Sequence, residues 1–265
     1  MREIIATPVC VYLFQFNNVL GHPKPRDFVW HSPATGLACG AGGGGVFADK
    51  WAQHLVDNLP ETAIGTFRAF AEWMEQIWNP FYTEYEKVAQ EQGGMLLNKF
   101  YDEGSFATLV AAWRTGNKVK WMAYGDSVVF HYNRRTKVLA HSFTSISDFS
   151  KPPYLLNWKD EALEEGFASG EFDVSGPSYV FACSDALSHY IMMMYAVANG
   201  EELPISEDKN GNIIALARTM KVDFEKDVLK PMFNALRTDS LPAHCRSKYR
   251  KGLLALDDYS LARLV

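Results

Sequence analysis

The tract of five glycines and one alanine at positions 40–45 constrains the fold of this chain more than any other feature. It follows an apolar strand region at 36–39 and precedes an amphipathic stretch at 46–59, so it joins a strand to a helix. Its spacing satisfies G-x-G-x-x-G, which in a dinucleotide-binding unit lets a pyrophosphate approach a helix N-terminus. That unit also requires a second, parallel strand within about thirty residues, whereas here the helical pattern continues to Gln92. A dinucleotide site is therefore only a remote alternative.

The periodicity of apolar residues predicts an α+β protein. Short β-branched and aromatic runs between 106 and 142 predict an antiparallel meander with hairpin turns. The sequence contains no internal repeat and no linker, so we expect one domain over residues 1–265, with two antiparallel sheets covered by helices. We expect strands at 9–16, 28–30, 36–39, 106–113, 119–123, 128–132, 138–142, 179–183 and 257–265, helices at 46–59, 61–92, 187–199 and 224–236, and a tight turn at 208–212.

Composition excludes several classes of protein. The net charge is −5 and the longest basic cluster, at 246–251, is short, so we expect no nucleic-acid partner. No window approaches the ~20 apolar residues of a membrane span. The four cysteines are widely spaced, which argues against a disulfide framework and favours a reducing cytoplasm. The sequence therefore predicts a soluble, cytoplasmic protein without a membrane partner.

Five further segments carry short motifs in a recognisable order. Ahead of the glycine tract stands Pro-Arg-Asp-Phe at 25–28; after it come a glycine-led, threonine-containing strand at 104–110, Gly-Asp-Ser at 125–127, an apolar strand ending in Ser-Asp at 184–185, and Asp-Asp at 257–258. Together with the tract, these segments resemble the motifs of PP2C-type (PPM) metal-dependent protein serine/threonine phosphatases. The resemblance extends from about residue 20 to the C-terminus and implies a PP2C-like α-β-β-α sandwich.

The resemblance also implies a chemistry. In such enzymes two Mn²⁺ or Mg²⁺ ions, bound by oxygen ligands, activate a water that attacks the phosphorus of phosphoserine or phosphothreonine. Carried over by position, the catalytic residues would be Asp185, Asp257 and Asp27, the metal ligands would be Asp185, Asp257, the Gly40 carbonyl and Asp126, and Lys24 and His22 stand near the place of a phosphate-binding arginine.

Four positions depart from the family pattern, and all four belong to the site. Cys39 replaces the aspartate that bridges the two metals, and Arg26 replaces a glutamate. Ala186 replaces a glycine, and His189 stands where the family often has another acid. Two lost acids and one added cation weaken a divalent site, because a guanidinium is repelled by the ion and competes for its carboxylates.

Two hypotheses follow for the altered site. In the first, Arg26 occupies the position of the lost metal and pairs with Asp185 or Asp257. In the second, Cys39, Asp185, Asp257 and His189 together form a zinc site, since thiolate, carboxylate and imidazole are acceptable zinc ligands.

The sequence thus favours a PP2C-like domain whose metal-dependent catalysis is impaired or absent, a pseudophosphatase that binds a protein or a phosphorylated ligand. The alternative is an active phosphatase with an atypical divalent site. Manganese or magnesium is the expected cofactor if the protein is active, and none is needed if it is silent. The expected partner is a phosphoprotein or another protein, and the segments at 143–178 and 200–222 are candidates for a flap over the cleft.

Overall fold

The computed structural model describes residues 10–13, 26–29, 34–40, 45–203, 209–255, 257 and 259–263, and only the backbone at 10–13, 26–29, 34–35 and 209–210. The strands are β1 (Cys10–Leu13), β2 (Arg26–Val29), β3 (Ala34–Gly40), β4 (Phe106–Thr115), β5 (Lys118–Tyr124), β6 (Val128–Asn133), β7 (Val138–His141), β8 (Leu156–Asn157), β9 (Phe167–Asp173), β10 (Ser178–Cys183) and β11 (Leu261–Arg263). The helices are α1 (Ala48–Asp57), α2 (Phe67–Gln92), α3 (Gly94–Glu103), α4 (Asp185–Asn199), α5 (Lys209–Ala217), α6 (Lys230–Arg237) and α7 (Leu241–Arg250), with short 3₁₀ turns at Ile146–Ser150 and Glu164–Gly166 and a π-helical turn at Phe224–Leu229.

The strands form two main sheets, and every strand pair among the described residues is antiparallel. The first sheet has the order β3-β4-β5-β9, with β8 paired to β4, and the second has the order β11-β10-β6-β7. A separate pair joins β1 to β2. Because a dinucleotide-binding unit needs two parallel strands joined through a helix, the glycine tract does not belong to one here.

Alternation along the strands divides the apolar side chains into three cores. On β4, Leu109 faces the helices that cover the first sheet, whereas Val110 faces the second sheet. On β10, Phe181 faces the helices of the second sheet, whereas Val180 meets the inter-sheet core. Each sheet therefore buries both of its faces, one against the other sheet and one against helices.

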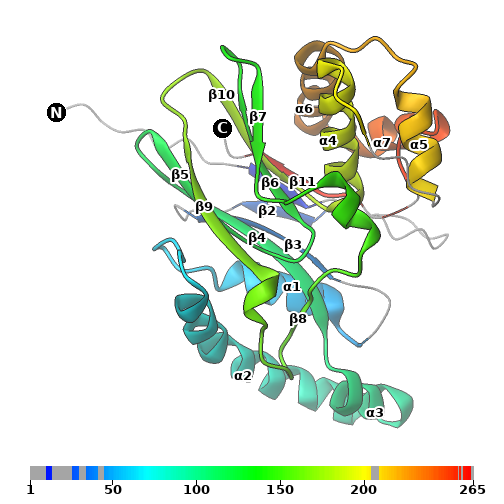
Figure 1. The fold of residues 1–265 in the computed structure, drawn as a ribbon. Helices are drawn as coiled ribbons and strands as arrows, with labels where there is room; N and C mark the ends of the chain where they lie inside the picture. Colours follow the sequence, from blue (N-terminus) through cyan, green and yellow to red (C-terminus); the bar gives the residue numbers. More distant parts are fainter. Residues whose placement is uncertain are drawn as a thin grey trace.

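Figure 1 shows the resulting layers, with α1, α2 and α3 on one side of the strands and α4 to α7 on the other. The core under the first group is rich in aromatic residues, and the core under the second contains the Met192–Met194 run as packing. The predicted fold class, two antiparallel sheets flanked by helices, is confirmed. Within the described residues, none of the helices combines the length and the hydropathy that a membrane crossing requires.

The sequence-based elements between 106 and 142 are confirmed as strands, but the expected single meander is wrong. The chain makes a hairpin from β4 to β5 and then leaves the first sheet at Gly125–Ser127, so that β6 and β7 join the second sheet. A Gly-Asp pair is equally compatible with a hairpin and with a turn that leads to the other sheet, so it did not distinguish these two arrangements. The turn expected at 208–212 is also wrong, since residues 209–212 lie in α5.

Two other differences concern helices. The long helix predicted from residue 61 begins at Phe67, where Thr66 accepts a hydrogen bond from the Ala69 amide, and it continues through Pro80 without a break. The sequence analysis did not predict α3, which begins directly after Gly93. A glycine can end one helix without preventing a second helix from beginning directly after it. Here the second helix is stabilised because the apolar side of α3 packs Phe100 into the core beneath the first sheet.

Candidate functional site

Four motif-bearing segments converge at one end of the inter-sheet layer, which we call the motif end. They are the last residues of β3, the crossing from β5 to β6, the first residues of α4 and the segment that precedes β11. The Ser184 amide donates to the Ser260 carbonyl over 3.1 Å, and the Ser260 amide donates to Ser184 Oγ over 3.0 Å. The charges of Asp185 and Asp126 both act on the Cys39 thiol. The structure therefore brings Cys39, Asp126 and Asp185 together, and Asp257 acts in turn on Asp126.

Buried hydroxyl groups support this convergence. Thr108 lies opposite Cys39 in the β3–β4 register, and its Oγ1 lies 2.8 Å from Ser127 Oγ. Thr108, Ser127, Ser184 and Ser260 are all buried. Thr108, Ser127 and Ser184 lie within the motifs, but the motifs did not predict a role for them. The sequence does single out Thr108 as a candidate, because it is a polar residue within the apolar run at 106–113.

Two motif glycines are required by the backbone. Gly125 has φ of 90°, and a Cβ there would lie 2.6 Å from the Tyr154 carbonyl oxygen and 2.7 Å from Thr108 Cγ2. A Cβ on Gly40 would lie 2.6 Å from the carbonyl of Ala48, because the end of β3 packs against the first turn of α1. Contacts this short do not occur for real side chains, so the packing alone requires glycine at both positions.

Cys39 occupies the position that the resemblance gives to the metal-bridging aspartate. Its side chain is half-buried and packs against the inter-sheet core. Burial and the negative charge of Asp185 together raise the pKa of the Cys39 thiol to about 12, against hydrogen bonds with Ser260 and Ser127 that lower it. In the absence of a bound metal, a thiol with so high a pKa is protonated near neutral pH and is not a good nucleophile.

The acids of the motif end differ in their electrostatic surroundings. Burial, helped by the charge of Asp257 and opposed by a hydrogen bond with the Asp126 backbone amide, raises the pKa of Asp126 from 3.8 to about 6. Asp185 is the first residue of α4, where the helix dipole stabilises a carboxylate. The negative charges of Asp126 and Asp257 therefore disfavour each other.

The remaining substituted positions adapt to their surroundings. Ala186 lies in the first turn of α4, is buried and has ordinary helical backbone geometry, so a glycine is not required there. His189 lies one turn further on and is also buried. Its ring meets the edge of Phe149 at a centroid distance of 5.7 Å. His189 thus contacts the 3₁₀ turn at Ile146–Ser150, which belongs to one of the expected flap segments.

Several expected site residues cannot be placed by their side chains. Lys24, His22 and Asp258 lie outside the described residues, and the structure describes only the backbone of Arg26 and Asp27. That backbone pairs with β1, so that Asp27 stands opposite Tyr12, and β1 in turn contacts β11. The hypothesis that Arg26 replaces a metal stays a prediction.

The described donors do not fit a site for two hard divalent ions. Within the described part of the chain, no group of three or more His, Cys, Asp or Glu side chains could hold a metal ion. Cys39, Asp185, Asp257 and His189 therefore do not form the zinc set that their residue types suggested. A cysteine at the bridging position also offers a soft sulfur atom where Mn²⁺ or Mg²⁺ requires oxygen ligands.

A scan of the sequence against family models finds no match, and a search of curated proteins finds none either. A search of solved structures finds similar chains. The serine/threonine phosphatase Stp1 from Staphylococcus aureus is 15% identical, with 87% of this chain and 82% of Stp1 covered and a TM-score of 0.45.

Two further structures have comparable values. The catalytic domain of the serine/threonine protein phosphatase PstP, solved with two manganese ions, is 14% identical and has a TM-score of 0.46, with 97% of this chain and 98% of PstP covered. PppA, a regulatory component of the type VI secretion system in Pseudomonas aeruginosa, is 15% identical, with 87% and 83% covered and a TM-score of 0.42. Stp1 and PstP are serine/threonine phosphatases, the class of enzyme that the motifs resemble.

Proposed function

We propose that this chain is a PP2C-like protein serine/threonine phosphatase domain whose metal-dependent catalysis is impaired or absent, and that it acts by binding a protein or a phosphorylated ligand. The observation that carries the proposal is the state of Cys39. A thiol with a pKa of about 12 stands where the resemblance requires an aspartate that bridges two metals. Loss of that carboxylate removes one negative charge and two ligand bonds at once, which a divalent site of this kind does not tolerate easily.

The surrounding structure supports a retained scaffold rather than a degraded one. The Ser184–Ser260 hydrogen bonds, the Thr108–Ser127 pair and Gly125 still hold the motif segments together. A chain that had lost all use for this end would not need buried hydroxyls there, because each buried polar group must find a partner. The proposal therefore assigns the motif end a binding role within a single domain of a cytoplasmic protein that has no nucleic-acid or membrane partner.

An active phosphatase with an atypical divalent site is the second candidate, and one observation favours it. Asp126 and Asp257 are close enough for the charge of one to raise the pKa of the other. Paired acids of this kind are stabilised by a bound cation, which removes the repulsion between them. On this alternative Mn²⁺ or Mg²⁺ would bind to Asp185, Asp257, Asp126 and the Gly40 carbonyl.

Hydrolysis of p-nitrophenyl phosphate with added Mn²⁺ distinguishes the two candidates. The proposed function predicts turnover at the background level that the Asp185→Asn variant also shows. Robust turnover that depends on Mn²⁺ and disappears in Asp185→Asn would reject the silent domain and establish the second candidate. Asp57→Asn is the matched control, because Asp57 is the exposed last residue of α1, at the opposite end of that helix from its contact with Gly40.

A further inference from the structure

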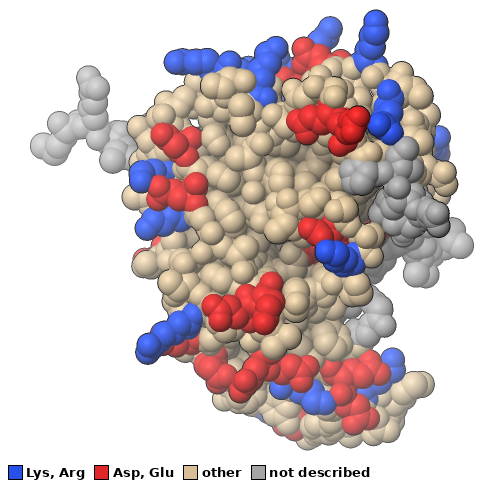
Figure 2. All heavy atoms as spheres, in the orientation of Figure 1, with Lys and Arg blue, Asp and Glu red and all other residues tan. Residues whose placement is uncertain are grey.

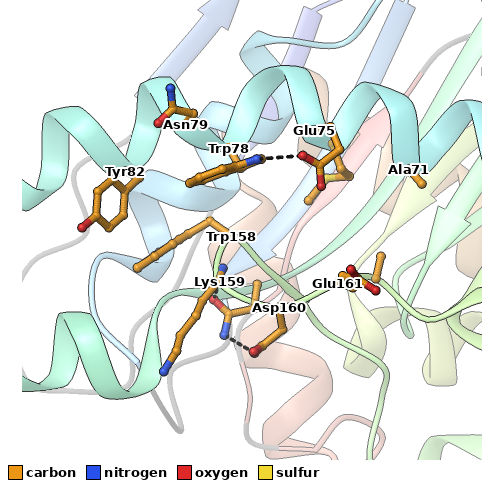
Figure 3. Close-up of a pocket in the computed structure, with 12 residues that line it drawn as sticks. Ala71, Glu75, Trp78, Asn79, Tyr82, Trp158, Lys159, Asp160 and Glu161 are labelled. Atoms are coloured by element: carbon orange, nitrogen blue, oxygen red, sulfur yellow. Dashed lines mark hydrogen bonds between the residues drawn. The ribbon is translucent and has the colours of Figure 1, made fainter.

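A second concave site lies far from the motif segments in the sequence, between α2 and the segment that follows β8. Its cavity has a volume of about 410 Å³. We call it the α2 groove and define it by six of its lining residues, which Figure 3 shows facing one another across the hollow: Glu75, Trp78, Tyr82, Trp158, Asp160 and Glu161. A cavity of this size is in the range of small-ligand sites, about 300–1,000 Å³.

The sequence builds one wall of the groove by helical spacing. Residues 71, 74, 75, 78, 79 and 82 of α2 line it, and these positions follow the i, i+3, i+4 rule for one face of a helix. The neighbouring face, which includes Phe70, Ile77 and Phe81, packs into the core beneath the first sheet. The groove face is therefore a second apolar stripe on α2 that the protein's own core leaves partly uncovered.

The aromatic walls are held in fixed positions. The Tyr82 hydroxyl donates to Glu86 Oε1 over 2.6 Å, and the Trp158 indole N–H donates to Ser105 Oγ over 2.9 Å. The Tyr82 and Trp158 rings lie 5.2 Å apart, and Trp78 meets the edge of Tyr82 at 6.2 Å. Aromatic groups that are fixed before binding lose little conformational freedom when a ligand arrives.

Acidic side chains outnumber basic ones among the residues that line the groove. The Glu75 carboxylate accepts from the Trp78 indole N–H over 3.2 Å, and Asp160 accepts from the Asn157 side chain over 2.8 Å. Glu161 is exposed and has neither an ion pair nor a hydrogen bond within the part of the chain that the structure describes. The one lysine among the lining residues, Lys159, directs its ammonium to the Asp102 carbonyl at 2.6 Å.

Acidic side chains also gather along the lower edge of the molecule in Figure 2, where Figure 1 places α2 and α3. Three carboxylates without an ion pair among the described residues and three fixed aromatic rings thus share one hollow. That combination complements an organic cation, because the ring faces and the carboxylates both attract positive charge.

We propose that the α2 groove binds an arginine side chain of a partner protein. The guanidinium would stack on the Trp78 and Tyr82 rings, and Glu161 or Glu75 would accept its hydrogen bonds. Arginine fits better than lysine, because its planar group stacks on aromatic faces, binds carboxylates through two N–H groups and is more weakly hydrated. The α2 groove shares no residue with the motif end, so this proposal stands whether or not the metal motifs bind ions.

The test uses the full chain and two peptides that differ in one group. Each peptide has seven residues of glycine and serine around a central arginine or a central citrulline, which has the same shape without the charge. Binding is followed by the indole N–H signals of the tryptophans in a nuclear magnetic resonance titration. We expect the arginine peptide to bind about tenfold more tightly than the citrulline peptide and to shift the Trp78 signal.

Variants locate the binding. Trp78→Leu keeps an apolar side chain but removes the ring face, and we expect about a fivefold loss of affinity; Glu161→Gln should lose about threefold. Glu84→Gln is the matched control, because Glu84 is exposed on α2 and does not line the groove. Equal affinity of the two peptides would overturn the proposal. So would an equal loss in Glu84→Gln and Glu161→Gln, which would indicate general attraction to an acidic protein.

Discussion

The motif end and the α2 groove are both acidic, yet their acids are set in opposite surroundings. At the motif end the carboxyl of Asp126 is largely enclosed, its pKa is raised to about 6, and the next residue, Ser127, is buried. In the groove, Glu75, Asp160 and Glu161 are exposed beside fixed aromatic rings. The first arrangement constrains the fold, because changes there alter buried interactions. In the groove, Glu75 and Asp160 each accept one hydrogen bond at an exposed carboxylate, which leaves acceptor oxygens available to a ligand.

The acids of the two regions should therefore affect different properties: those of the motif end affect the stability of the folded state, and those of the groove affect ligand binding. Enclosed acids that repel each other reduce the stability of the folded state unless a cation joins them. Exposed acids contribute little to stability in either direction. Substitutions at the two regions should therefore separate cleanly into effects on unfolding and effects on binding.

The largest expected effect is on the backbone of the motif end. Gly125→Ala should lower the free energy of unfolding by roughly 4 kcal/mol, because the added Cβ meets a positive φ and two contacts below 3 Å. Gly116→Ala is the matched control: Gly116 has φ of 60° with nothing near its Cβ position, so we expect a loss of about 1 kcal/mol. Urea unfolding followed by circular dichroism measures both, and equal losses would show that the Gly-Asp-Ser turn is not a packing constraint.

The next effect concerns charge at the position of Cys39. In the presence of a chelator, Cys39→Asp should lower the free energy of unfolding by roughly 3 kcal/mol, because it adds a carboxylate beside Asp185 and Asp126 in an enclosed place. Cys39→Asn has nearly the same shape without the charge, and we expect a loss of about 1 kcal/mol. If the two variants unfold at the same urea concentration, the acids of the motif end do not interact as described.

A smaller effect should appear in the pH dependence of the free energy of unfolding. The folded pKa of Asp126 lies above its ordinary value of 3.8, at about 6, so between these values the folded state holds a proton that the unfolded state has lost. Stability should therefore fall as the pH rises from about 4 to about 6, by about 2 kcal/mol once partial exposure is allowed for. Asp126→Asn should remove this part of the pH dependence. An unchanged pH profile in that variant would contradict the raised pKa.

The smallest effect belongs to the α2 groove. Glu161→Gln and Glu75→Gln should change the free energy of unfolding by less than about 0.5 kcal/mol, since both side chains are exposed and neither has an ion pair. The same two variants should weaken binding of the arginine peptide. A loss of stability larger than that of Gly116→Ala would show that the groove acids have a structural role, and it would remove the contrast between the two regions.

The sequence predicted the two regions unequally. Strand and helix periodicity, with Gly125, Asp126 and Asp185 in motif order, was enough for the layered fold and for the residues that meet at one end. The sheet change after β5 was not predictable, because Gly-Asp is a signal for a turn and not for its direction. The α2 groove was not predictable either. Its aromatic stripe has ordinary helical spacing, and the opposite wall, with Trp158 and Glu161, comes from a segment about eighty residues away in the chain.

The central claim is that substitution at Cys39 has impaired the metal site, and calorimetric titration with Mn²⁺ tests it most directly. The comparison is between the wild-type chain and the double variant Cys39→Asp with Arg26→Glu, which restores the two family acids. The account predicts no Mn²⁺ binding to the wild type below about 1 mM and at least a tenfold gain in affinity in the double variant, about 1.4 kcal/mol or more. Binding of two Mn²⁺ ions to the wild type at micromolar concentration, with no gain in the double variant, would contradict it.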